Sequence, residues 1–438
     1  MPTQSADNQG DSGARPFAGI EVVEFGQFIA VPYCAQLLAD GGAHVIKIES
    51  LEGDPVRLIA PLAPGESRHF ISRNRGKHSL PLDLKHPGAR PVIDALLARA
   101  DVVLTNFRPG LAAELSLDGA SLGPRHPRLI VGNVTAFGPR GPDAMLAGMD
   151  LVVQGRSGLM AANGRLRDGQ PTVSDPPVVD YMCAMMLAFG IASALYRRAQ
   201  TGRGGEIDVS LLMAALTIQT NAMVRVESVD APHHAGLAAA LAGLRARGAP
   251  YVEQAAVNPQ IRTPAMVRVY YRSFATRDAS LAVACGSPAL RRAFIRALGL
   301  TDEALDHPLV DVDAQARHYD ALGARVEALV ASRTTAEWKT VLDAHGVPAA
   351  GVKLPFELLD DEQALVNGML YDLPHPLLGT LRVASTPVRM DGAGFQPSPA
   401  TPPFGSEVAD LLGGLGFPRE TVEQLVKDGV TRTTYPAR

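Results

Sequence analysis

The sequence predicts an α/β protein, with a Rossmann-like open parallel sheet in a large domain and a second, smaller α/β domain. Between residues 20 and 136, short apolar runs alternate with helical patterns in strand–helix–strand order. That order implies right-handed crossovers on a parallel sheet. The length of 438 residues exceeds one average domain, and a second series of strand and helix patterns follows residue 262. Two α/β domains are therefore expected.

The large domain is predicted to begin with a strand over residues 20–26, which ends at a glycine, and a helix over 32–40, which ends at two glycines. A long apolar helix follows Asp180, and Gly202 is expected to be its C-cap. The remaining predicted strands cover 44–49, 79–84, 101–107, 128–136 and 206–211, and another helix covers 86–100.

Changes in composition divide the chain into five segments. The segment rich in Ala, Gly and His has weak periodicity and is interpreted as a linker, and the proline-rich segment as a return to the large domain. In the small domain we expect strands over 267–271 and 281–285 and helices over 288–298 and 335–345. The predicted segments are a disordered tail (1–15), the first part of the large domain (16–225), a linker (226–262), the small domain (263–375), and a return segment with C-terminal helices over 406–412 and 418–428 that completes the large domain (376–438).

Composition excludes several classes of function. A net charge of −4 gives no electrostatic basis for binding nucleic acid or an anionic membrane. Cys34, Cys183 and Cys285 are scattered, without the spacing of a disulfide framework or a zinc site. The N-terminus lacks the apolar core of a signal peptide, and the apolar stretch after Asp180 is shorter than the about 20 residues that span a bilayer. We therefore expect a cytoplasmic protein without a bound metal.

A classical dinucleotide site is also not expected. No G-x-G-x-x-G pattern follows the first predicted strand. The glycine-rich stretch over 201–205 lacks the Lys-Ser/Thr pair of a P-loop, and it follows a helix where a phosphate loop would precede one.

Asp180 is the candidate catalytic residue. It is the last charged residue before an apolar run that continues to Arg197. At a helix N-terminus the helix dipole favours the ionised carboxylate, which could act as a nucleophile. The same residue could be an ordinary N-cap, whose side chain accepts a backbone hydrogen bond. This segment alone leaves both interpretations open.

A series of motifs in order along the chain resembles the family III CoA-transferases, the group of formyl-CoA and carnitine CoA-transferases. The similarity extends from about Ile20 to Val430, and although each piece is weak, their order is specific. The matching stretches are residues 38–49 with Gly53-Asp54, 74–79 with 82–85, 100–102 with 106–110, 179–181 with 194–198, 201–204, 335–338 and 346–348.

The resemblance implies a covalent mechanism at Asp180. Its carboxylate would attack the thioester of an acyl-CoA to give a mixed anhydride, which the CoA thiolate converts to an aspartyl-CoA thioester. A carboxylic acid acceptor then leaves as its CoA ester through a second anhydride. The CoA thioester is a substrate in this scheme, and no cofactor is bound permanently. The resemblance also implies an interlocked homodimer.

Four residues are predicted to bind CoA. Asn106 and Phe107 follow the carboxyl end of a predicted strand, where open α/β sheets bind ligands. By resemblance this segment, with Arg108, lies along the CoA chain, and Lys77 matches a basic residue near the nucleotide phosphates. The alternatives are a turn role for Asn106, a core role for Phe107, and simple solvation of the two cations.

The chain departs from the formyl-CoA transferase pattern at three places. Ile29 stands where a CoA-contacting glutamine is expected, and Glu114 where an arginine is expected. The tetraglycine loop has no counterpart before Tyr270. These departures argue against formyl-CoA and oxalate. By resemblance, short (di)carboxylic acids are expected as substrates, most commonly dicarboxylates such as succinate, bound with an arginine in the pocket.

Three other functions fit the same resemblance. Acyl-CoA racemases carry a histidine in a Gly-His-Asp motif, but the matching residue here is Met149, which cannot exchange a proton. A non-catalytic acyl-CoA-binding protein would not need Asp180. Intramolecular transfer of CoA within one dicarboxylate uses the same nucleophile and stays open.

Overall fold

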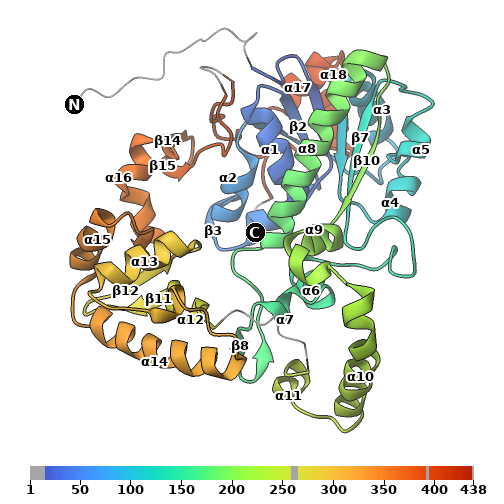
Figure 1. Cartoon of the computed structure of the whole chain (residues 1–438). Coiled ribbons are helices and arrows are strands. Elements are labelled where there is room, and N and C mark those ends of the chain that lie inside the picture. The colour runs from blue at the N-terminus through green and yellow to red at the C-terminus, as the bar shows by residue number, and fades with distance from the viewer. Residues whose placement is uncertain (1–14, 258–264, 391–393, 437–438) are drawn as a thin grey trace, which may run out of the picture. The chain divides into compact units, whose positions relative to one another are not determined.

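A computed structural model describes residues 15–257, 265–390 and 394–436 (Figure 1). The chain forms two compact units. The large unit combines the chain up to Ala255 with the chain from Gln363 onward, and the small unit covers Ala256–Glu362. The predicted tail (except Arg15), the end of the predicted linker and part of the segment before Tyr270 lie outside the described residues.

A six-stranded parallel sheet organises the large unit, in the order β10-β7-β6-β1-β2-β5. The chain runs outward from β1 to one edge and from β6 to the other, so the strand order reverses between β1 and β6. The predicted parallel sheet is confirmed. The strands are β1 (Glu21–Glu24), β2 (His44–Glu49), β5 (Lys77–Pro81), β6 (Val102–Thr105), β7 (Ile130–Thr135) and β10 (Gly205–Ser210).

Helices cover both faces of this sheet. On one face lie α1 (Ala30–Asp40), α8 (Val178–Thr201) and α9 (Leu211–Ile218), and on the other α3 (Ala89–Arg99), α17 (Val408–Gly414) and α18 (Arg419–Lys427) (Figure 1). Neighbouring strand residues therefore enter different cores: Val22 packs with the α1–α8 side, and Val23 with the α3 side.

The apolar stretch after Asp180 was expected to be too short to span a bilayer, but helix α8 as a whole begins already at Val178. Its 24 residues are apolar enough and numerous enough to cross a membrane, the one such helix in the described part of the chain. Its buried residues Cys183, Leu187 and Ile191 instead pack in the core shared with α1 and the sheet. The helix ends as predicted at Gly202, which adopts a left-handed conformation with φ 71°.

The predicted linker is helical where the structure describes it. It forms α10 (Glu227–Ala246) and α11 (Tyr251–Ala255). Alanine has the highest helix propensity, so an alanine-rich sequence forms a helix even without a strong apolar stripe. The shorter elements of this unit are η2 (Pro55–Leu58), β3 (Pro61–Ala63), β4 (Glu66–Ser67), α2 (Arg68–Asn74), α4 (Pro109–Glu114), α5 (Gly119–Leu122), α6 (Asp150–Arg156), α7 (Leu159–Ala162), β8 (Leu166–Arg167), β9 (Gln170–Pro171) and η3 (Thr220–Met223).

The hairpin of β14 (Leu370–His375) and β15 (Gly379–Ala384) belongs to the large unit, whereas the small domain was predicted to extend to residue 375. Arg75 of the large unit donates a hydrogen bond of 2.9 Å to the carbonyl oxygen of Ala384. The Tyr371 hydroxyl donates to the carbonyl of Ser398 in the return segment. These bonds attach the hairpin to the large unit, so the boundary falls at Glu362 instead of residue 375.

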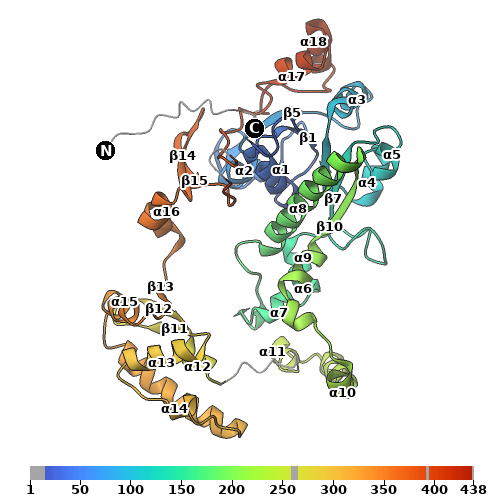
Figure 2. The same cartoon turned by 45° about the horizontal axis from the view of Figure 1, so that its top comes forward.

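The small unit contains a three-stranded antiparallel sheet in the order β11-β12-β13, surrounded by helices (Figure 2). Trp338 is buried in its core and donates its indole N–H to the carbonyl of Val330. The strand predicted over 267–271 begins only at Tyr271, because the preceding residues form a helical turn. The elements are α12 (Val267–Tyr270), β11 (Tyr271–Ala275), β12 (Ser280–Ala284), α13 (Pro288–Ala297), η4 (Glu303–Leu305), α14 (Val312–Val330), α15 (Thr335–Ala344), β13 (Ala349–Gly351) and η5 (Pro355–Asp360), with α16 (Glu362–Val366) at the boundary.

Candidate active site

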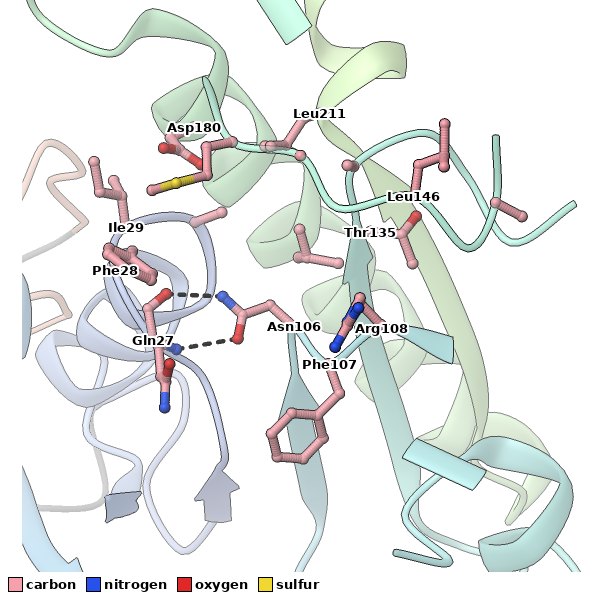
Figure 3. A pocket seen from close by; sticks show the side chains of 16 residues that line it. Gln27, Phe28, Ile29, Asn106, Phe107, Arg108, Thr135, Leu146, Asp180 and Leu211 are labelled. Carbon is pink, nitrogen blue, oxygen red and sulfur yellow. Dashed lines mark hydrogen bonds between the residues drawn. The ribbon is translucent and has the colours of Figure 1, made fainter. Parts of the chain in front are cut away.

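A cavity of about 100 Å³ opens at the carboxyl ends of β1, β6 and β7, at the point where the strand order reverses (Figure 3). Open α/β sheets bind ligands at this point. Asp180, Asn106, Phe107 and Arg108 all line the cavity, so the structure brings four of the five predicted site residues together. The other lining residues are Gln27, Phe28, Ile29, Ala30, Val134, Thr135, Ala136, Ala144, Leu146, Gly148, Met149 and Leu211.

Asn106 joins the two loops at the reversal point. Its side-chain oxygen accepts the backbone N–H of Gln27 at 3.1 Å, and its amide nitrogen donates to the carbonyl of Gln27 at 2.8 Å (Figure 3). Both ends of the carboxamide are thus bonded to the backbone. Asn106 positions the cavity wall, and a direct bond from its side chain to CoA stays a prediction.

The loop after β1 is held in a strained conformation. Phe28 has φ 67°, in the left-handed region that costs a non-glycine residue roughly 1–2 kcal/mol. Its N–H donates to Asp54 at 3.3 Å, and buried Lys47 donates to the carbonyl of Gly26 at 2.7 Å. Buried charges therefore hold this loop against the cavity, as is typical of strain at functional sites.

Lys77 has a different place from the one predicted. Its ammonium is fully buried, lies 2.7 Å from the Glu24 carboxylate, and donates to the carbonyl of Pro32 and the side chain of Asn74. Burial lowers the pKa of Lys77 to about 8. A side chain without exposed surface cannot meet a nucleotide phosphate, so Lys77 is corrected to a structural ion pair beneath the strained loop.

We expect Lys77→Ala to destabilise the fold instead of selectively weakening CoA binding. The substitution leaves the buried Glu24 carboxylate with one cation fewer, which costs about 3 kcal/mol. The urea midpoint should fall clearly, whereas Lys85→Ala, at an exposed position nearby, should change the unfolding free energy by about 0.5 kcal/mol or less. An unchanged midpoint together with a raised KM for CoA esters would restore the phosphate role.

Phe107 and Arg108 line the cavity, as residues that bind a ligand would. Phe107 is half-buried and packs on Phe25, with ring centroids 6.1 Å apart. Arg108 is exposed and forms no ion pair with any residue that the structure describes. It is therefore a cation at the cavity that an anionic ligand could use.

Asp180 is not the N-cap of α8. Pro177 occupies the N-cap position, and Asp180 is the third helical residue. The cap is supplied by Asp150, whose Oδ2 accepts the N–H groups of Val179 at 2.9 Å and Asp180 at 3.0 Å. The Asp180 side chain accepts no hydrogen bond from the described residues. Its carboxylate is therefore available to a substrate in the cavity.

The pKa of the Asp180 carboxyl is raised to about 7, mainly by burial and in addition by the negative charge of Asp150, while the charge of Arg73 acts in the opposite direction. The sequence suggested the opposite direction, because a helix N-terminus favours an ionised carboxylate. Desolvation and a like charge outweigh that effect here. A carboxylate with this pKa is less strongly stabilised in its ionised form, and so is a better nucleophile.

Comparison with known proteins shows the family. The pattern of CoA-transferase family III matches residues 17–408. The chain belongs to this family. It is 29% identical to cinnamoyl-CoA:phenyllactate CoA-transferase of Clostridium sporogenes (95% of this chain, 98% of the relative) and 31% identical to acetyl-CoA:oxalate CoA-transferase of Acetobacter aceti (86% and 90%). A solved CAIB/BAIF family protein from Brucella suis superposes with a TM-score of 0.71 at 27% identity, over 92% of this chain and 100% of that one.

In this family III CoA-transferase, Asp150 belongs to a buried network that sequence reasoning missed. Its Oδ1 accepts from Gln154 at 2.5 Å, and Gln154 in turn accepts from the N–H and hydroxyl of Ser174, on the loop before α8. Asp150 and Gln154 are four residues apart in α6 and so lie on one face. The available signals were that spacing and the match of Asp150 to the aspartate of the Gly-His-Asp motif. Neither signal indicated that Asp150 caps the N-terminus of α8, thirty residues later in the chain.

Proposed function

We propose that this chain transfers CoA from an acyl-CoA to a carboxylic acid through intermediates bonded covalently to Asp180. The observation that carries the proposal is the position of Asp180. Its carboxylate does not cap the helix, has a pKa of about 7, and lines the cavity at the point where the strand order reverses. Membership of the family supports the same reaction class.

The reaction proceeds by acyl exchange at three carbonyl carbons: those of the donor acid, of Asp180 and of the acceptor acid. An Asp180 oxygen attacks the thioester carbon and the C–S bond breaks. CoA thiolate departs, and a mixed anhydride forms between the donor acyl group and Asp180. The thiolate attacks the Asp180 carbonyl, which releases the first acid and forms an aspartyl thioester. The acceptor carboxylate attacks that thioester, which frees the thiolate and forms a second mixed anhydride with Asp180. The thiolate then attacks the acyl carbon of the acceptor, which gives the new CoA ester and regenerates the Asp180 carboxylate. Each step replaces one leaving group, as covalent catalysis requires.

The loops around the cavity suit the CoA portion of the substrate. Phe107 offers an apolar wall for the pantetheine chain, and Arg108, which forms no ion pair within the described part of the chain, offers a cation for a phosphate. Asn106 keeps the two loops at a fixed spacing. Similar proteins are named for phenyllactate, oxalate and glutarate, all carboxylic acids, and we propose short mono- or dicarboxylic acids for this chain.

We further propose that the chain acts as a homodimer, interlocked as the family resemblance implies. Part of α8 exposes large apolar side chains: Phe189 is 76% and Tyr196 70% exposed. Exposed apolar surface of this kind is typical of an interface. Light scattering after size exclusion should give twice the chain mass, and a concentration-independent monomer would remove this proposal.

An isomerase is disfavoured by the cavity itself. Met149 lines it at the position of the racemase histidine, and a thioether has no proton to exchange. Intramolecular transfer of CoA within one dicarboxylate uses the same Asp180 chemistry and is included in the proposal.

Hydroxylamine trapping tests the covalent mechanism. During turnover it should convert Asp180, and no other aspartate, to a hydroxamate that peptide mass spectrometry detects. Asp175, an exposed carboxylate five residues earlier, is the internal control and should stay unmodified. Turnover without any modification of Asp180 would contradict the mechanism.

A further inference from the structure

Gly53 and Asp54 form a turn between β2 and η2, and neither residue lines the candidate cavity. Gly53 has φ 82°, and a Cβ atom there would lie 2.9 Å from the side chain of Arg57. The hydroxyl of Ser50 donates to the carbonyl of Gly53, and Glu49 accepts the N–H of Asp54 at 2.8 Å. This turn favours glycine and fixes the direction of the Asp54 side chain.

Asp54 has three partners for its side chain, which is almost fully buried. Its Oδ1 accepts the N–H of Val56 at 3.1 Å, which makes Asp54 the N-cap of η2, and also the N–H of Phe28 at 3.3 Å. Its Oδ2 lies 3.0 Å from Nζ of Lys47. Capping accounts for the contact with Val56 alone. The bond to Phe28 therefore needs a separate explanation.

Hydrogen bonds hold the backbone at three successive residues of the loop after β1. The first two residues are bonded to the side chains of Lys47 and Asn106. The third is Phe28, whose left-handed conformation with φ 67° persists in a non-glycine residue only when the surroundings restrain it. Asp54 accepts the N–H of Phe28, so its carboxylate opposes relaxation of the strained residue.

The conformation of Phe28 determines the shape of one wall of the cavity. Four consecutive residues of this loop line the cavity: Gln27, Phe28, Ile29 and Ala30 (Figure 3). A change of Phe28 to negative φ would redirect the chain immediately before Ile29. The wall that faces a bound CoA ester would then be displaced.

We infer that Asp54 is a positioning residue, which holds Phe28 in the left-handed conformation and so shapes the wall that receives the CoA portion of the substrate. The inference rests on the proposed function for the identity of the ligand. Asp54 lies outside the cavity and acts through a backbone hydrogen bond. Its replacement should therefore weaken the binding of CoA and leave the reactivity of Asp180 intact.

The test compares Asp54→Ser with Asp54→Asn, which both remove the negative charge beside Lys47. Serine is a good N-cap for η2, but its shorter side chain does not reach Phe28, whereas asparagine keeps an oxygen acceptor for both N–H groups. The dissociation constant of CoA, measured by calorimetry, should rise about 10-fold in Asp54→Ser and less than about 3-fold in Asp54→Asn. A 10-fold change equals about 1.4 kcal/mol, which is the size of the strain in a left-handed non-glycine residue.

Substitutions at Phe28 show whether the effect passes through its backbone. Glycine adopts a left-handed conformation without strain, so in a Phe28→Gly background Asp54→Ser should change the dissociation constant of CoA by less than about 3-fold. Alanine removes the ring but keeps the strain, so in a Phe28→Ala background the rise of about 10-fold should remain. Equal effects of Asp54→Ser in the two backgrounds, or equal effects of Asp54→Ser and Asp54→Asn, would overturn the inference.

A variant at Phe28 tests the same requirement without touching the buried charges, and decides the matter if Asp54→Ser does not fold. Phe28→Pro imposes negative φ and removes the N–H that Asp54 accepts. It should bind CoA at least about 10-fold more weakly than Phe28→Ala. Equal affinities of these two variants would overturn the inference.

Measurements of stability and labelling separate this role from two others. Asp118→Ala removes the N-cap of α5, away from the cavity, and should lower the urea midpoint without changing the affinity for CoA. If Asp54→Ser behaves in the same way, Asp54 is only a structural cap and the inference fails. Hydroxylamine labelling of Asp180 at saturating acyl-CoA should persist in Asp54→Ser. Absence of labelling in the wild type would contradict the covalent mechanism, whereas the affinities for CoA would still decide the role of Asp54.

Discussion

Asp180→Asn is expected to lower kcat for CoA transfer by about 10⁴-fold or more, because removal of a covalent nucleophile leaves only binding and positioning. Asparagine has nearly the same shape, and Asp180 accepts no hydrogen bond from the described residues, so the cavity should be preserved. Binding of CoA esters, measured by calorimetry, should change little. Steady-state exchange between two acids measures the loss directly.

The same substitution should stabilise the fold. The pKa of Asp180 is about 7 in the folded chain and about 3.9 when unfolded, so the folded state retains a proton that the unfolded state loses. The loss of unfolding free energy caused by Asp180 is absent below pH 4, grows between pH 4 and 7, and is complete above pH 7. Asparagine cannot ionise, so Asp180→Asn should gain roughly 2–4 kcal/mol in unfolding free energy at pH 8, and almost nothing at pH 4.

Asp175→Asn is the control for both effects, since this exposed carboxylate lies outside the cavity. It should alter neither kcat nor stability measurably. A variant at Asp180 that kept full activity would exclude the nucleophile, and one that lost stability at pH 8 would show that the carboxylate has a bonding partner. A lower kcat together with a higher unfolding free energy in Asp180→Asn would show that this carboxylate is kept for activity at the expense of stability.

The parallel sheet and its order of elements could be predicted from sequence because the signals are local. Apolar runs ended by glycine mark β1, and the glycine after α8 marks its C-cap. The positions of Asn106 and Phe107 followed from one rule, that ligands meet the carboxyl ends of parallel strands. The same reasoning could not separate a helix from a linker over 227–246, where alanine favours a helix without an apolar stripe.

Contacts between distant residues explain the failures at the site. Lys77 resembled a phosphate ligand, but its carboxylate partner is Glu24, more than fifty residues earlier. Asp180 resembled an N-cap, but Asp150, thirty residues earlier, already accepts the N–H groups at the start of α8. Burial set the pKa of Asp180 against the direction that the helix dipole alone suggested. Each correction depends on the folded environment and on no local pattern.

Replacement of Asp150 is expected to lower both stability and activity. As the cap of α8 it fixes the first turn of the helix that carries Asp180, and as a charge it raises the pKa of that residue. Asp150→Ala leaves two backbone N–H groups without their acceptor. We expect a loss of about 1–2 kcal/mol in stability and of roughly 10- to 100-fold in kcat, since the nucleophile is displaced. Asp143→Asn, on a neighbouring loop, should have neither effect.

Asp150→Asn separates the charge of Asp150 from its hydrogen bonds. The amide oxygen can still accept from α8, but the negative charge is gone, so the pKa of Asp180 should fall. Activity requires the ionised carboxylate, so the acidic limb of the kcat/KM profile, expected near pH 7 in the wild type, should move to lower pH. A profile that keeps its midpoint in Asp150→Asn would mean that burial alone raises the pKa of Asp180, and that Asp150 acts only as a cap.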